Sequence, residues 1–215
     1  MMQHRTYCAV GPWIKVGLWS SGLLGLAIFG FALASLSLKV FAAQGGSTQA
    51  SVDVKAALTP KVTAMELISD GSPQAESIAH AALLYASFWD TGDPTFARWA
   101  LATGFIDRTL PEGRAQGITG PLEASKTFRA AVPDLSVTVE HLLVVGDRAV
   151  VRLRFNGHFT GVFGEQRGQG QKIDFRAVDM YRVREGFITD NWHLEDYQTL
   201  FSQLAAKAVT TGVKS

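Results

Sequence analysis

The sequence contains a single cysteine, Cys8, among its 215 residues. One cysteine cannot form an intrachain disulfide, and no cysteine–histidine cluster has the spacing of a zinc site. Charge is also sparse, because only 18% of the residues are charged and the formal net charge is +1. No basic stripe runs along the chain, so we expect no nucleic-acid partner and no metal site.

Residues 1–43 differ in composition from the rest. Basic residues precede a stretch from Val16 to Leu38 that contains no charged side chain. The small residues Val40 and Ala42 that follow resemble a secretory signal cleaved near Ala42–Ala43. The stretch also reaches the roughly 20 residues of a membrane-spanning helix, so an uncleaved apolar anchor is the alternative. Both predict a periplasmic or extracellular protein whose N-terminus starts in the cytoplasm.

The remaining chain divides by composition into three parts. Residues 44–74 are rich in Gly, Ser, Thr and Ala and predict a linker, with a short helix around Val62–Ile68. A compact domain is predicted over residues 75–206, and a flexible tail over residues 207–215. The domain opens with three stretches of helical periodicity, which are AESIAHAALLYASFWDT, TFARWALA and PLEASKTFRAA.

From Leu135 onward the apolar pattern becomes that of strands. Gly146-Asp147 suits a tight hairpin turn between LSVTVEHLLVV and RAVVRLRFNGHF. The first of these strands changes parity, which predicts a bulge near Glu140–His141. The Gly-rich stretch GVFGEQRGQGQ has no phosphate-loop spacing and predicts a flexible connection or the rim of a pocket.

A second hairpin is predicted to turn at Glu185-Gly186. A two-residue turn would pair Asp179 with Trp192, and would place His193 and Glu195 on the solvent side. The opposite, largely apolar face would then also carry carboxylates, and its members would be Phe175, Ala177, Asp179, Tyr181, Val183, Ile188, Asp190, Trp192, Leu194 and Asp196. Helices followed by strands predict an α+β domain with three helices on one side of a curved antiparallel sheet.

The order of these motifs resembles the SnoaL-like polyketide cyclases of the nuclear-transport-factor-two-like superfamily. The resemblance covers about Ala75 to Leu204. It rests on AVPDLSVTVE, on GDR before a strand, and on the pattern D-x-Y-R-x-x-x-G-x-I-x-x-x-W-x-x-x-D from Asp179 to Asp196. It implies a cone of helices and sheet, a cystatin-like α+β barrel, enclosing an apolar pocket for a hydrophobic small molecule.

The resemblance also implies a chemistry, an intramolecular aldol ring closure that needs no metal or cofactor. An aspartate acts as acid and base in this reaction, and the motif assigns that role to Asp196, with Asp179 as a second catalytic group. The residues expected to bind substrate are Trp89, Arg108, Phe155, Phe159, Phe175, Tyr181 and Trp192. The sequence departs from the family where relatives carry pocket histidines, because Arg108 and Phe159 stand at those positions.

Structural roles compete with each of these assignments. Asp196 directly precedes the helical stretch YQTLFSQL and is also a favoured N-cap. Asp179 is equally suited to a structural hydrogen bond with the Trp192 indole, and Trp192 to the core. Arg108 either holds an anionic substrate group or forms a surface ion pair, and Asp190 is expected to be solvated.

Two classes of function therefore stay open. The first is an ester-cyclase-, polyketide-cyclase- or isomerase-type enzyme acting on a small carbonyl compound. The second is an exported, non-catalytic binding module for a hydrophobic molecule. A homodimer is predicted in both cases, because relatives pair through the outer sheet face and Val137, Val150 and Arg154 would otherwise be exposed.

Overall fold

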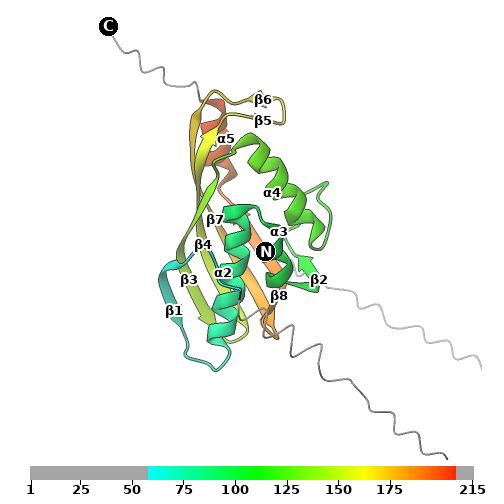
Figure 1. Ribbon diagram of the computed structural model, residues 1–215, viewed down its shortest axis with the longest axis vertical. Helices are drawn as coiled ribbons and strands as arrows, with labels where there is room; N and C mark the ends of the chain where they lie inside the picture. Colours follow the sequence, from blue (N-terminus) through cyan, green and yellow to red (C-terminus); the bar gives the residue numbers. More distant parts are fainter. Residues whose placement is uncertain (1–57, 207–215) are drawn as a thin grey trace, which may run out of the picture. The chain divides into compact units, whose positions relative to one another are not determined.

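The computed structural model describes residues 58–206 (Figure 1). The helices are α2 (Ala75–Thr91), α3 (Pro94–Ala100), α4 (Thr119–Ala131) and α5 (Tyr197–Ala205). The strands are β1 (Ala64–Ser69), β2 (Leu101–Asp107), β3 (Ser136–Val145), β4 (Arg148–Phe159), β5 (Val162–Phe163), β6 (Gln166–Arg167), β7 (Gln171–Arg184) and β8 (Phe187–Glu195).

The predicted signal or anchor and the predicted tail lie outside the described residues. No helix between residues 58 and 206 combines the length and the hydropathy of a membrane-spanning segment.

Six of the strands form one sheet in the order β1-β3-β4-β7-β8-β2. The central pairs are antiparallel, and the edge strands β1 and β2 run parallel to β3 and β8. Figure 1 shows α2, α3 and α4 together on one side of this sheet. The predicted α+β architecture with three helices on one side of a mostly antiparallel sheet is confirmed.

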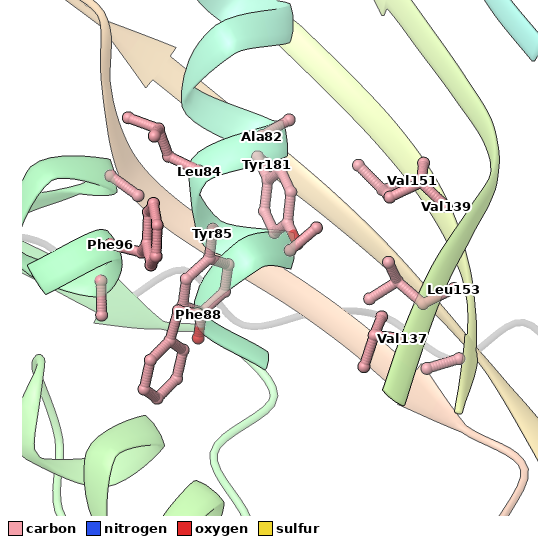
Figure 2. Close-up of a cluster of buried hydrophobic side chains, with 14 of the residues drawn as sticks. Ala82, Leu84, Tyr85, Phe88, Phe96, Val137, Val139, Val151, Leu153 and Tyr181 are labelled. Carbon is pink, nitrogen blue, oxygen red and sulfur yellow. The ribbon is translucent and has the colours of Figure 1, made fainter. Parts of the chain in front are cut away.

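The core lies between α2 and the sheet. Ile78, Ala82 and Tyr85 follow helical spacing and are all buried. They pack towards the inward side chains of β3, β4 and β7, and Figure 2 shows Tyr85 of α2 close to Tyr181 of β7. The helix ends at Gly92, whose φ of 74° is left-handed and whose N–H donates to the Phe88 carbonyl. Glycine adopts this conformation without strain, so the helix ends here with its last turn capped.

Two elements differ from the sequence prediction. The segment expected as a helix around Val62–Ile68 is the strand β1, which pairs in parallel with β3. The prediction was wrong because β1 is fixed by a long-range pairing at the edge of the sheet, which local composition does not reveal. The Gly-rich connection contains the short hairpin of β5 and β6.

Two bulges set the register of the antiparallel part of the sheet. The bulge predicted near Glu140–His141 is confirmed, because the pairing of β3 with β4 shifts between Val139 and His141. The second was not predicted and lies in β8, where Val183 pairs with Ile188 but Arg182 already pairs with Asp190. The extra residue is Thr189.

The bulge in β8 exchanges the two faces of that strand. Side chains alternate with a period of two, so one inserted residue turns every later side chain to the opposite face. Asn191, His193 and Glu195 therefore face the helices, whereas Leu194 is 75% exposed. Trp192 lies on the outer face, where the guanidinium groups of Arg148 and Arg182 stack on its ring.

Candidate functional site

A cavity of about 390 Å³ lies between α4 and the inner face of the sheet. Ligand pockets in proteins commonly measure about 300–1,000 Å³, so this volume suits a small molecule. Its described walls come from α2, β2, the loop that follows β2, α4, β4, β5, β7, β8 and the start of α5.

One wall of the cavity is aromatic. Trp89 meets Phe155 edge to face with ring centroids 6.3 Å apart, and Phe155 stacks on Phe175 at 5.0 Å. All three residues line the cavity, as predicted from the sequence. Tyr85 and Phe105 extend the same wall. Such rings offer large apolar surfaces at little entropic cost, which favours a flat apolar ligand.

Asp179 lies at the polar end of the cavity. Its side chain is buried, and the Tyr181 hydroxyl donates to Oδ2 at 2.7 Å. Burial raises the pKa of Asp179 to about 6, although the Tyr181 hydrogen bond and the charge of His193 act in the opposite direction. The carboxylate is therefore mostly ionised at neutral pH and still basic enough to accept a proton.

His193 lies opposite Asp179 in the β7–β8 pairing. Its Nε2 donates to the Asp107 carboxylate at 3.0 and 3.1 Å, and its Nδ1 donates to Glu195 Oε1 at 2.9 Å. Burial lowers the pKa of His193, but the hydrogen bonds and charges of Glu195 and Asp107 outweigh it and raise the pKa to about 9. At neutral pH the site therefore contains an imidazolium held between two carboxylates.

The carboxylate of Asp107 is fixed by its own surroundings. Asp107 ends β2, its backbone N–H donates to Gln116 Oε1 at 2.7 Å, and its carbonyl accepts from Gln116 Nε2 at 2.9 Å. Its Oδ1 accepts from the Thr109 N–H at 2.9 Å, while Thr109 Oγ1 accepts from the His193 N–H. The loop after β2 thus holds the acid in place against the imidazolium.

Asp196 lies outside the cavity. Its exposed carboxylate accepts from the Thr199 N–H at 3.0 Å and from Thr199 Oγ1 at 2.7 Å, which is the N-cap of α5. These hydrogen bonds lower the pKa of Asp196. The prediction that this carboxylate projects into the cavity was wrong, because β8 ends one residue earlier and its last inward residue is Glu195.

Several other expected contacts are also absent from the described cavity wall. Trp192 lies on the outer face, and Tyr181 and Phe159 are buried behind the wall rather than in it. Tyr181, and not Trp192, donates the structural hydrogen bond to Asp179.

Arg108 forms the ion pair that was the alternative to substrate binding, with Nη2 2.6 Å from Asp190 Oδ1. Asp190 was expected to be solvated, but it is buried and also accepts from the Thr189 hydroxyl at 2.8 Å. The unpredicted bulge at Thr189 brings these three residues together.

Sequence reasoning missed several polar cavity residues, among them Asp107, Asn191, His193 and Glu195. Three of them stand on β8 beyond the bulge and were therefore assigned to solvent. Their spacing of two does mark them as one strand face, but which face they share depends on the register. Asp107 was given no role from the sequence, because only its neighbour Arg108, which stands where relatives carry histidine, was considered.

Comparison with known proteins agrees with the fold and the cavity. Residues 79–204 match the SnoaL-like polyketide cyclase family. A candidate polyketide cyclase of known structure from Bacillus cereus ATCC 10987 is 37% identical over 68% of this chain and 95% of its own, with a TM-score of 0.61. TsrD from Streptomyces laurentii is 25% identical over 61% of this chain and 97% of its own, with a TM-score of 0.56.

A more distant structure shares the fold alone. The candidate SnoaL-like polyketide cyclase from Jannaschia sp. CCS1 is 22% identical over 64% of this chain and 98% of its own, with a TM-score of 0.56. Among proteins with curated functions, none matches this sequence significantly. With its family match over residues 79–204, its helix-covered sheet and its aromatic cavity, the chain belongs to the SnoaL-like polyketide cyclase family.

Proposed function

We propose that the domain is a cyclase- or isomerase-type enzyme that moves a proton on a small carbonyl compound, with Asp179 as the acid and base. The observation that supports this most directly is a buried carboxylate with a pKa of about 6 at the polar end of an aromatic cavity. General acid–base catalysis is most effective when the pKa of the catalytic group lies near the working pH.

The groups around Asp179 have different roles in the proposed reaction. Asp179 takes a proton from a carbon next to the carbonyl group and later returns it at another atom. The Tyr181 hydroxyl holds the carboxylate in place. His193 donates its two ring N–H groups to Asp107 and Glu195. It therefore acts through its positive charge rather than as a hydrogen-bond donor to substrate. That charge offsets the two carboxylates, which would otherwise repel the enolate that forms after proton removal.

The pH dependence of proton transfer tests this proposal. We expect the rate of deuterium exchange at the α-carbon of 2-tetralone to rise with an apparent pKa of about 6, as Asp179 ionises. It should fall near pH 9, as His193 loses its proton and its charge. Proton NMR in D2O measures the exchange after subtraction of the buffer rate. Binding of the ketone without accelerated exchange would contradict the enzyme and favour a carrier.

The cellular location is a separate proposal. We propose that residues 1–43 direct the domain across the inner membrane, on the basis of the uncharged stretch Val16–Leu38. The intact mass of the protein recovered from cells distinguishes cleavage near Ala42–Ala43 from an uncleaved anchor.

We also propose a homodimer formed through the outer face of the sheet. Val178 and Leu194 pair across β7 and β8 on this face and are 42% and 75% exposed, beside Met180 at 39%. Two residues named from the sequence do not contribute as expected, because Val137 is buried and Arg154 forms an ion pair with Asp174. Exposed apolar clusters of this kind commonly mark protein interfaces.

We expect Val178→Asp to convert the dimer to a single chain, because a carboxylate would have to be desolvated at the centre of the interface. Light scattering measures the molar mass of the purified protein. Val162→Asp is the control, since Val162 is similarly exposed but belongs to the β5–β6 hairpin. A wild-type mass equal to one chain would contradict the dimer.

A further inference from the structure

Asn191 carries a buried hydrogen-bond acceptor that is not satisfied by the protein. The side chain lines the cavity and is 4% exposed, and its Oδ1 atom has no hydrogen-bond partner among residues 58–206. Buried polar atoms are nearly always paired, and an unpaired one is unfavourable. Asn191 belongs to the cavity wall, so a bound molecule that contacts its side chain could supply the missing donor.

The register of the sheet places Asn191 beside the proposed catalytic groups. It pairs with Tyr181 on β7, which holds the Asp179 carboxylate, and it stands two residues before His193 on the same face of β8. A ligand group that reaches Asn191 therefore lies next to Asp179.

Acidic side chains outnumber basic ones in the cavity wall. The carboxylates that line it are those of Asp107, Glu112, Glu123, Asp179 and Glu195. The cationic residues that line it are Arg114 and His193, and both His193 ring nitrogens already donate to carboxylates. The site therefore disfavours an anion, which would meet like charge, and favours a group that donates hydrogen bonds.

We propose that Asn191 is a ligand-binding residue whose side-chain oxygen accepts a hydrogen bond from a hydroxyl or ammonium group of the ligand. The cavity thus selects flat, apolar molecules that carry a hydrogen-bond donor at one end, and it rejects those that carry a carboxylate there. This inference rests on the proposed function only in taking a small molecule as the occupant, and it requires no turnover.

Four probes of one shape test the proposal. They are 2-methylnaphthalene, 2-naphthalenemethanol, 2-naphthylmethylamine and 2-naphthoate, and isothermal titration calorimetry gives their affinities for the purified full-length protein. We expect the alcohol or the amine, or both, to bind more tightly than 2-naphthoate, and the two arms distinguish a hydroxyl from an ammonium ligand. Equal or tighter binding of 2-naphthoate would overturn the proposal.

The role of Asn191 itself is tested by Asn191→Leu, which removes the acceptor at similar volume. We expect the affinity of the preferred donor probe relative to 2-methylnaphthalene to fall about 3- to 10-fold, the usual effect of one hydrogen bond. Asn156→Leu is the matched control, because Asn156 lies on β4 outside the cavity wall and should leave this ratio unchanged.

An unchanged ratio in Asn191→Leu would overturn the role of Asn191. Circular dichroism checks that the variant folds, and Asn191→Ala replaces it if it does not. The proposed enzyme activity and the proposed role of Asn191 are tested by different measurements. Loss of the probe preference would leave the deuterium exchange of 2-tetralone intact, and absence of that exchange would leave the probe preference intact.

Discussion

Asp179→Asn is expected to reduce α-carbon exchange of 2-tetralone by about 100- to 10,000-fold, the usual contribution of a general base. The amide is close in size to the carboxylate and its oxygen still accepts the hydrogen bond from Tyr181, but it cannot take up a proton. Proton NMR in D2O measures the loss under the conditions of the pH profile.

The same substitution is expected to stabilise the fold at neutral pH. The pKa of Asp179 is raised from 3.8 to about 6, so the folded protein binds the proton more tightly than the unfolded chain. The resulting cost is absent below about pH 4, grows as pH rises through about 6, and amounts to about 3 kcal/mol above that. Removing the charge removes this cost, so we expect denaturant unfolding at pH 7 to show a gain of about 1–3 kcal/mol.

Asp196→Asn provides the matched control for both the exchange rate and the free energy of unfolding. Asp196 caps α5 at the surface, and asparagine is an equally good N-cap, so neither exchange nor stability should change appreciably. If instead the exchange rate falls in Asp196→Asn and persists in Asp179→Asn, the assignment of the base to the buried carboxylate is wrong.

The second large effect is expected from His193→Leu. This change leaves the carboxylates of Asp107 and Glu195 without their shared cation in a buried site. Breaking a buried ion pair by removing one partner typically costs about 3–5 kcal/mol, so the free energy of unfolding at pH 7 should fall by that order. Urea unfolding followed by circular dichroism measures the change.

The pH dependence of this loss of stability follows from the direction in which the His193 pKa is shifted. The pKa of His193 is raised from 6.5 to about 9, so its stabilising contribution is complete below pH 6.5 and is lost as pH rises through about 9. The difference between wild type and variant should therefore shrink above pH 9.

His158→Leu is the control for the buried pair. His158 also lies 2.7 Å from an aspartate, Asp134, but both side chains are more than half exposed. Exposed ion pairs contribute little because water screens them, so this variant should unfold almost as the wild type does. Similar stability losses in the two variants would show that the buried charge network is not what makes His193 important.

Some of the site was readable from the sequence because β7 is regular. Asp179 and Phe175 alternate with outward residues along one uninterrupted strand, and both face the cavity as expected. Trp89 was placed correctly for a similar reason, since it continues the apolar stripe of α2. The side-chain period, 2 residues in a strand and 3.6 in a helix, is a local property. It can therefore be recognised in the sequence without knowing which elements pack against the strand or helix.

The assignment of the base failed where the period was broken. Up to Ile188 the predicted pairing of β8 is correct, and beyond Thr189 every side chain lies on the opposite face. Asp190, which follows the inserted residue Thr189, is buried with its carboxylate paired to Arg108. These two residues are 82 positions apart in the chain. No local pattern encodes that contact, so the bulge that it accompanies was not predicted.

The sequence by itself determined the four helices from α2 to α5, the two long hairpins, the α+β class and the aromatic character of the cavity, because each follows from the spacing of apolar residues along the chain. Only the tertiary structure decided that Glu195 and His193, and not Asp196, line the cavity. One extra residue in β8 reverses the two faces of the strand, and long-range contacts rather than local periodicity fix where that residue is inserted.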